Sequence, residues 1–111
     1  MIVAIKEDNV MNITSETNGK QVTFALEGRL DTVSAPELEK VLGANLDGVE
    51  ELILEFEKLR YLSSAGLRVL LAAQKKMNAQ KGSMVIKHVN EMIMEVFEVT
   101  GFLDILTVEN D

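Results

Sequence analysis

The chain has 111 residues, of which 47% are hydrophobic, and it carries no cysteine and a formal net charge of −7. A chain of this length can bury a hydrophobic core without the support of disulfides or metal ions. The missing cysteines exclude disulfides and thiolate metal sites. The acidic balance argues against nucleic acid as the main partner, because phosphate neutralisation supplies most of that affinity. No apolar run approaches the ~18 residues of a bilayer span, and the N-terminus is too short and too acidic for a secretory signal. We therefore expect a cytoplasmic protein without membrane insertion.

We expect a single domain over residues 11–111, with residues 1–10 forming an N-terminal extension or an edge strand. Residues 21–27 alternate between apolar and polar side chains, which predicts a strand with one buried face. Gly28 and Asp31 are predicted to end this strand.

The segment Ser34-Ala35-Pro36-Glu37 is typical of a capped helix start, with Ser34 as the cap and Glu37 three residues later. This helix is predicted to stop near residues 45–48. Further elements are predicted in the order strand 52–56, helix 64–80, strand 83–87, helix 91–100 with Gly101 as its C-terminal cap, and strand 105–108. Alternation of strands and helices implies parallel neighbours joined by right-handed crossovers.

Charge is unevenly distributed along the chain. No acid occurs from Lys58 to Asn90, a segment that contains seven bases. This segment is either a basic surface for an acidic partner or phosphate, or a basic helix lying beside acidic neighbours in the same fold.

The chain contains few of the residues that catalysis usually requires. His88 is the only histidine, and a lone histidine after a strand is more often a surface residue than a base. The turn Leu62-Ser63-Ser64-Ala65-Gly66 is similar to a nucleophile elbow, but Leu62 stands where that motif has its first glycine. We therefore expect no enzyme, no metal and no cofactor.

The same turn is suited to modification. A serine at the first position of a helix exposes its hydroxyl beside backbone N–H groups, where a phosphate would be stabilised by the helix dipole. Arg68, one turn beyond Ser64, would help to neutralise that phosphate, and Gly66 would allow close approach to the backbone. The alternative is that Ser63 or Ser64 is only an N-cap.

Three spaced motifs resemble the STAS domain, the fold of the bacterial anti-sigma factor antagonists. They are Tyr61 to Leu71 around the serine turn, Gly28-Arg29-Leu30-Asp31 with Ser34-Ala35, and Thr100-Gly101-Phe102. The resemblance covers about residues 12–108. It implies an α/β fold of order β-β-α-β-α-β-α-β, with a mostly parallel central sheet and helices packed chiefly on one side.

The resemblance also implies partner switching. In that family the unmodified domain binds an anti-sigma factor that is also a serine kinase, phosphorylation releases it, and a serine phosphatase resets the system. Matched by position, the phosphorylated serine is Ser64, with Ser63 as the weaker candidate, and Asp31 is the acidic residue near the switch. The family's Asp is replaced here by Ser63, and its second Ser/Thr by Ala65. The implied partner-binding residues are Asp31, Ser63, Ser64, Ala65, Gly66 and Arg68.

Two other functions stay open from the sequence. The chain could be a STAS subunit of another assembly without a phospho-switch, such as a lipid-transport accessory or a stressosome-like scaffold. It could also be a small-ligand or nucleotide sensor.

Overall fold

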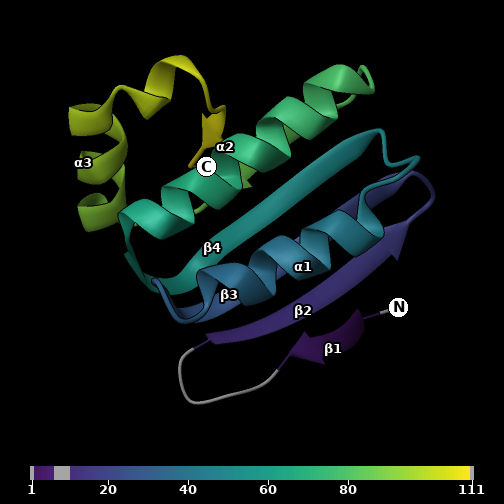
Figure 1. The fold of residues 1–111 in the computed structure, drawn as a ribbon, viewed down its shortest axis with the longest axis horizontal. Coiled ribbons are helices and arrows are strands. Elements are labelled where there is room, and N and C mark those ends of the chain that lie inside the picture. The colour runs from purple at the N-terminus through teal and green to yellow at the C-terminus, as the bar shows by residue number, and fades with distance from the viewer. Residues whose placement is uncertain (1, 7–10, 111) are drawn as a thin grey trace.

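The computed structural model describes residues 2–6 and 11–110, which form one six-stranded sheet with helices against it (Figure 1). The strands lie side by side in the order β1-β2-β3-β4-β5-β6. The strands are β1 (Ile2–Lys6), β2 (Met11–Asn18), β3 (Gln21–Leu30), β4 (Glu51–Leu62), β5 (Ser83–Lys87) and β6 (Val108–Glu109). The helices are α1 (Ala35–Asn45), α2 (Ser64–Ala79), α3 (Glu91–Thr100) and the short 3₁₀ helix η1 (Phe102–Asp104).

The sheet changes from antiparallel to parallel at β3. β1 pairs antiparallel with β2 at one edge, and β2 pairs antiparallel with β3 through a tight turn that contains Gly19. From β3 onward each strand is parallel to the next, because a helix connects it to its neighbour. The expected mostly parallel α/β sheet is confirmed.

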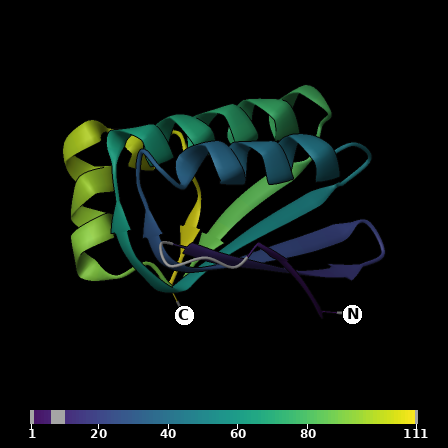
Figure 2. The same cartoon turned by 60° about the horizontal axis from the view of Figure 1, so that its bottom comes forward.

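The helices cover one face of this sheet, as Figure 2 shows most clearly for α1 and α2. Alternate side chains of the central strands point toward them and form the core, among them Phe24, Leu54 and Phe56, each with no exposed surface. The side chains between these residues face away from the helices, and those of Ala25 and Glu55 line a hollow on the uncovered face. The expectation of helices chiefly on one side is therefore confirmed.

The first predicted strand is longer than expected. β3 does not end at Gly28 but continues to Leu30, with register shifts against β4 between Ala25 and Glu27 and between Gly28 and Arg29. Gly28 has a φ of +107°, which a glycine adopts without strain, so it permits a bulge in the strand where the sequence suggested a stop.

Two other local predictions hold only in part. Ser34 occupies the N-cap position of α1 as predicted, but its side chain makes no capping hydrogen bond to that helix. Its hydroxyl instead donates to the carbonyl of Arg29 (2.6 Å) and accepts from the N–H of Asp31 (2.9 Å). The segment predicted as strand 105–108 is mostly irregular after η1, and only Val108–Glu109 pairs with β5.

The strand predicted over residues 52–56 is also longer than expected, since β4 extends from Glu51 to Leu62 and leads directly into the serine turn. The helix boundaries agree closely with the sequence. α2 begins at Ser64 and ends one residue before the predicted limit, and α3 has its predicted bounds with Gly101 in the left-handed conformation as its cap. None of the helices formed by the described residues is both long enough and apolar enough to cross a membrane.

Candidate functional site

The candidate site lies where two parallel strands, β3 and β4, end together. Leu30 pairs with Leu62 in the sheet register, and the next residue along, Ser63, donates its N–H to the carbonyl of Leu30 (2.9 Å). This bond ties the start of α2 to the end of β3. The carboxyl edge of a parallel sheet is the usual place for a functional site in α/β folds.

The two serines of the turn have different roles. Ser63 is the N-cap of α2, and its side chain accepts a hydrogen bond from the N–H of Gly66 (3.4 Å). Ser64 is the first residue of the helix, and its side chain is exposed. The cap is therefore Ser63, which leaves the hydroxyl of Ser64 accessible at the positive end of the helix dipole.

Gly66 brings the first turn of α2 against the strand ends. A Cβ at this position would lie 2.6 Å from Cδ1 of Leu62 and 2.8 Å from Cγ of Leu30, closer than such atoms ever approach. Gly66 is buried, so the close approach expected from the sequence is made by the protein's own core. It positions the turn but offers no surface to a partner.

Asp31 begins the loop that leads from β3 into α1, and its carboxylate organises that loop. Oδ1 accepts hydrogen bonds from the backbone N–H groups of Val33 (3.0 Å) and Ser34 (3.1 Å), and Oδ2 lies 3.5 Å from Nε of Arg29. Partial burial opposes the charged form, but these hydrogen bonds outweigh it and lower the pKa of Asp31 below its usual value. Asp31 therefore stays ionised beside the serine turn.

Arg29 and Tyr61 contact each other near the ends of β3 and β4. They are paired in the register of β3 and β4, and the guanidinium of Arg29 lies 4.3 Å from the centre of the Tyr61 ring. Neither residue was selected as a site residue from the sequence. The signal was their position, since each comes two residues before a site residue on adjoining strands, namely Asp31 and Ser63.

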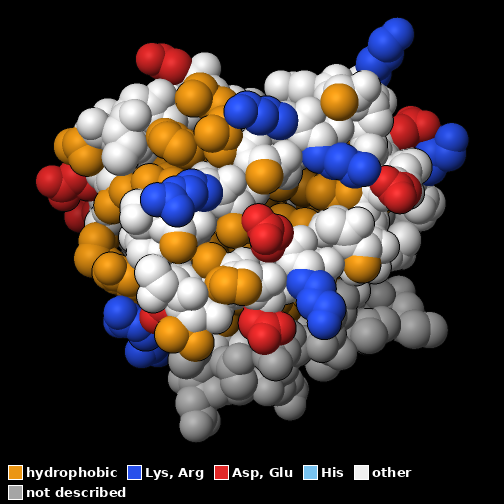
Figure 3. Space-filling view, in the orientation of Figure 1, with side chains coloured by type: hydrophobic (Ala, Val, Ile, Leu, Met, Phe, Trp, Pro, Cys, Tyr) orange, Lys and Arg blue, Asp and Glu red, His pale blue; other side chains and the backbone are white. Residues whose placement is uncertain are grey.

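A hollow opens beside the turn, between α1 and α2. It has a volume of about 230 Å³ and is lined from both helices, by Thr32, Ala35, Pro36, Glu39, Ala65, Arg68 and Val69. A second, mostly apolar hollow of about 180 Å³ shares Glu39 and Val69 with it and extends along the helices to Lys76. Figure 3 views this helix-bearing face, on which hydrophobic side chains gather between charged ones.

The structure thus brings together all six residues that the resemblance selected, around one strand-to-helix turn. Ser63 and Ser64 start α2, and Asp31 follows Leu30, the residue whose carbonyl accepts the N–H of Ser63. Ala65 and Arg68 line the adjoining hollow. The basic segment from Lys58 to Asn90 pairs in part with acidic residues of the same chain, because Nζ of Lys76 on α2 lies 2.7 Å from the carboxylate of Asp47.

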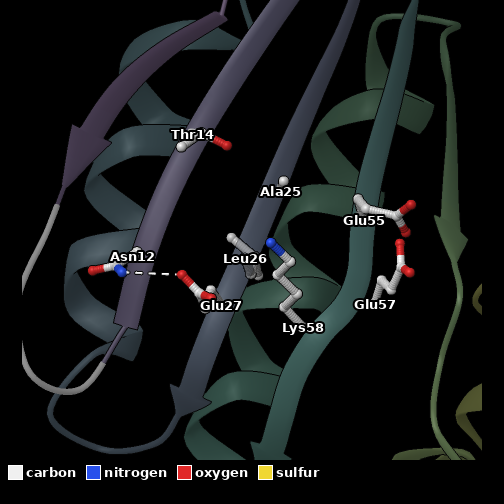
Figure 4. A pocket seen from close by; sticks show the side chains of 8 residues that line it. All are labelled: Asn12, Thr14, Ala25, Leu26, Glu27, Glu55, Glu57 and Lys58. Atoms are coloured by element: carbon white, nitrogen blue, oxygen red, sulfur yellow. Dashed lines mark hydrogen bonds between the residues drawn. The ribbon is translucent and has the colours of Figure 1, made fainter.

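His88 lies in another part of the molecule. It follows β5, and its Nδ1 atom is 2.6 Å from a carboxylate oxygen of Glu55 on β4. Glu55 lines the hollow on the uncovered face of the sheet, on the side away from α1 and α2 (Figure 4). The histidine is therefore grouped with strand carboxylates.

The sequence profile of the STAS domain matches residues 12–111. BtrV of Bordetella bronchiseptica, named as a candidate anti-sigma factor antagonist, is 35% identical over 101 residues, covering 90% of this chain and 87% of its own. The anti-sigma-B factor antagonist of Staphylococcus aureus is 31% identical over 99 residues, covering 88% of this chain and 92% of its own. The phosphorylated form of SpoIIAA, a Bacillus cell fate determinant, has a TM-score of 0.70 at 19% identity, with 87% of this chain and 90% of that chain covered.

The profile spans nearly the whole chain, and the sheet order, the one-sided helices and the serine turn agree with it. The chain belongs to the STAS domain family. Within that family, the two relatives from Bordetella and Staphylococcus carry the names of anti-sigma factor antagonists.

Proposed function

We propose that this protein is an anti-sigma factor antagonist that acts by partner switching. The proposal is supported by curated relatives of that name at more than 30% identity over nearly the full length of both chains. The observation that carries it is that the two serines of the turn have different roles. Ser63 caps the helix, and Ser64 presents an exposed hydroxyl. The unmodified protein binds an anti-sigma factor and thereby frees the sigma factor.

Phosphorylation of Ser64 is the release step of this proposal. A phosphoryl group adds a charge of about −1.5 to −2 and three acceptor oxygens at pH 7. At the first residue of α2 it lies at the positive end of the helix dipole, so the fold tolerates it. The surface that this chain presents to the partner changes, however. The phosphate charge adds to that of ionised Asp31, so a nearly neutral contact surface becomes anionic.

The partner of the unmodified form is then an anti-sigma factor with serine kinase activity, and a serine phosphatase restores binding. The contact surface consists of the turn, the loop that begins at Asp31 and the hollow that Arg68 lines. Arg68 is exposed one turn beyond Ser64 on the same helix, so it is placed to neutralise part of the phosphate charge. No catalytic step is assigned to this chain, and it needs no cofactor in this scheme.

The test compares wild type with Ser64→Ala and Ser64→Asp as baits for the kinase-type anti-sigma factor of the same organism. We expect Ser64→Ala to bind as wild type does, even with ATP present, and Ser64→Asp to bind at least tenfold more weakly. Incubation with kinase and ATP should add one phosphate to the wild type and none to Ser64→Ala, by intact mass. Equal affinity of both variants contradicts the switch.

Ser63→Ala is the matched control. It removes the cap and should lower the free energy of unfolding by about 0.5–1 kcal/mol, but it leaves the hydroxyl of Ser64 in place. Phosphorylation should therefore still occur in this variant. A phosphate found on Ser63 instead would move the switch by one residue.

A second function is favoured by one observation. Ser63 stands where the family has Asp, which removes a charge beside the switch. A STAS subunit of another assembly, without a phospho-switch, would tolerate this change. In that case the same partner is recovered equally by wild type, Ser64→Ala and Ser64→Asp.

A further inference from the structure

The uncovered face of the sheet contains a group of side chains that the proposed switch does not use. Glu55 and Glu57 come from alternate positions of β4, and His88 follows the end of the adjoining strand β5. One ligand atom from each of the three, two carboxylate oxygens and an imidazole nitrogen, lies within 4.8 Å of the other two. Figure 4 shows the carboxylates of Glu55 and Glu57 turned toward one another.

We propose that Glu55, Glu57 and His88 form a binding site for a divalent transition-metal cation, with Zn²⁺ as the best-suited ion. Zinc is held by imidazole nitrogen and carboxylate oxygen at about 2.0–2.2 Å, and three protein ligands leave a fourth position for water. The oxygen–nitrogen donor set favours zinc, cobalt or nickel over magnesium or calcium, which prefer oxygen ligands alone.

The geometry requires only a small adjustment. Around a tetrahedral ion with bonds of about 2.0–2.2 Å, ligand atoms lie roughly 3.3–3.6 Å apart. The Nδ1 atom of His88 is 2.6 Å and 2.9 Å from the two oxygens of Glu55, so these side chains must move apart by roughly 0.5–1 Å to admit the cation. Glu57 is exposed, so rotation of its side chain can close the remaining distance without moving the strand.

The backbone aims the histidine at the two glutamates. His88 has a φ of +59°, a left-handed conformation that is uncommon outside glycine. Its own N–H donates to the carbonyl of Glu109 at the end of β6, which holds this turn in place (3.3 Å). The imidazole therefore reaches back over β4.

Local charge also favours a cation. Two carboxylates this close repel each other, and a divalent cation relieves that repulsion. Lys58 points toward the Leu26 and Glu27 side of the hollow in Figure 4, away from the pair. Lys87 lies opposite Glu55 in the register and offsets part of the charge of the two carboxylates.

The test is calorimetric titration of Zn²⁺ into the untagged full chain, with Co²⁺ absorption as a second readout. We expect one equivalent to bind the wild type and to raise the melting temperature. Glu57→Gln and His88→Asn should each weaken binding at least tenfold. Asn tolerates the left-handed conformation, so His88→Asn should still fold, and Glu57 is exposed, so its replacement should not disturb the core.

The matched control is Glu27→Gln. Glu27 lines the same hollow on β3 and accepts a hydrogen bond from Asn12, but it is outside the three-residue group. It should bind Zn²⁺ as the wild type does. Absence of binding in the wild type at millimolar Zn²⁺, or equal binding by wild type, Glu57→Gln and His88→Asn, would show that His88 and Glu55 form only an ion pair.

Discussion

Gly66 illustrates how one residue joins the core to the switch. Its missing side chain lets Leu30 and Leu62 pack directly under the first turn of α2, and that turn carries Ser64. In the sequence alone, a glycine within a predicted helix indicates only that the helix is about 1 kcal/mol less stable than with alanine. The sequence does not show what offsets this loss. In the structure, the packing of the two strand ends does so.

Gly66→Ala is therefore expected to destabilise the fold. The new Cβ would force Leu62 and Leu30 apart, and overpacking of this kind costs about 1–3 kcal/mol. Chemical denaturation measures the loss. Gly43→Ala is the control, because Gly43 lies within α1 with no atom within 4 Å of an added Cβ, and this variant should gain about 0.5–1 kcal/mol. Equal effects at the two positions would argue against the packing explanation.

Asp31 leads to a prediction about pH. Its pKa is lowered in the folded state, so ionised Asp31 stabilises the fold above its unfolded pKa of about 3.8. That contribution falls as the pH drops through the lower, folded value. Asp31→Asn keeps an Oδ1 acceptor for the N–H groups of Val33 and Ser34 but loses the negative charge and the contact of Oδ2 with Arg29, so it should lose about 1 kcal/mol at pH 7.

Denaturation of wild type and Asp31→Asn at a series of pH values checks this. The difference between the two proteins should be constant near neutrality and shrink below about pH 4. A difference that persists unchanged in acid would assign the loss to the shape of the loop and not to the charge of Asp31.

At the scale of elements, the sequence predicted best where periodicity was long. α2 and α3 were placed to within one residue, because apolar spacing and the caps at both ends agree. β3 was cut short at Gly28, since a glycine in a bulge cannot be distinguished from a glycine in a turn without the partner strand. Ser34 was placed correctly at the N-cap position, but the partner of its hydroxyl was missed, because the bond to Arg29 depends on how the loop folds back.

The same limit applies to the site. The resemblance selected the serine turn and Asp31, and the register of β3 and β4 brings them together. The contact between Arg29 and Tyr61 and the hollow between α1 and α2 could not be predicted, because each depends on residues from two elements that lie far apart in the sequence. The group of Glu55, Glu57 and His88 was missed for this reason too.

Asn90 connects two elements, and its two functions can be separated. Its Oδ1 accepts from the N–H of Ile93 and caps α3 (2.8 Å), while its Nδ2 donates to the carbonyl of Leu59 on β4 (3.1 Å). Asn90→Ala should lose about 1–2 kcal/mol of unfolding free energy, because both bonds are removed. Asn90→Asp keeps the cap and loses the donor, so it should fall between Asn90→Ala and wild type. Thermal or chemical unfolding of the three proteins measures this order.

At the scale of the whole molecule, the position of β1 separates it from the rest of the domain. β1 pairs with β2 alone at the edge of the sheet, whereas the family profile begins at residue 12. We propose that residues 11–111 form the domain and that residues 1–10 are an addition to it.

A chain that starts at Met11 is then expected to fold, and to bind the partner with the affinity of the full chain. It should be less stable, because the hydrogen bonds between β1 and β2 are lost at about 1 kcal/mol each and β2 becomes an open edge. Circular dichroism, chemical denaturation and sedimentation measure fold, stability and association separately. If the shortened chain is unfolded, residues 1–10 are part of the domain. If it is folded but self-associates, the role of β1 is to protect the edge of β2, and this protection would explain why the chain carries a strand that the serine turn does not need.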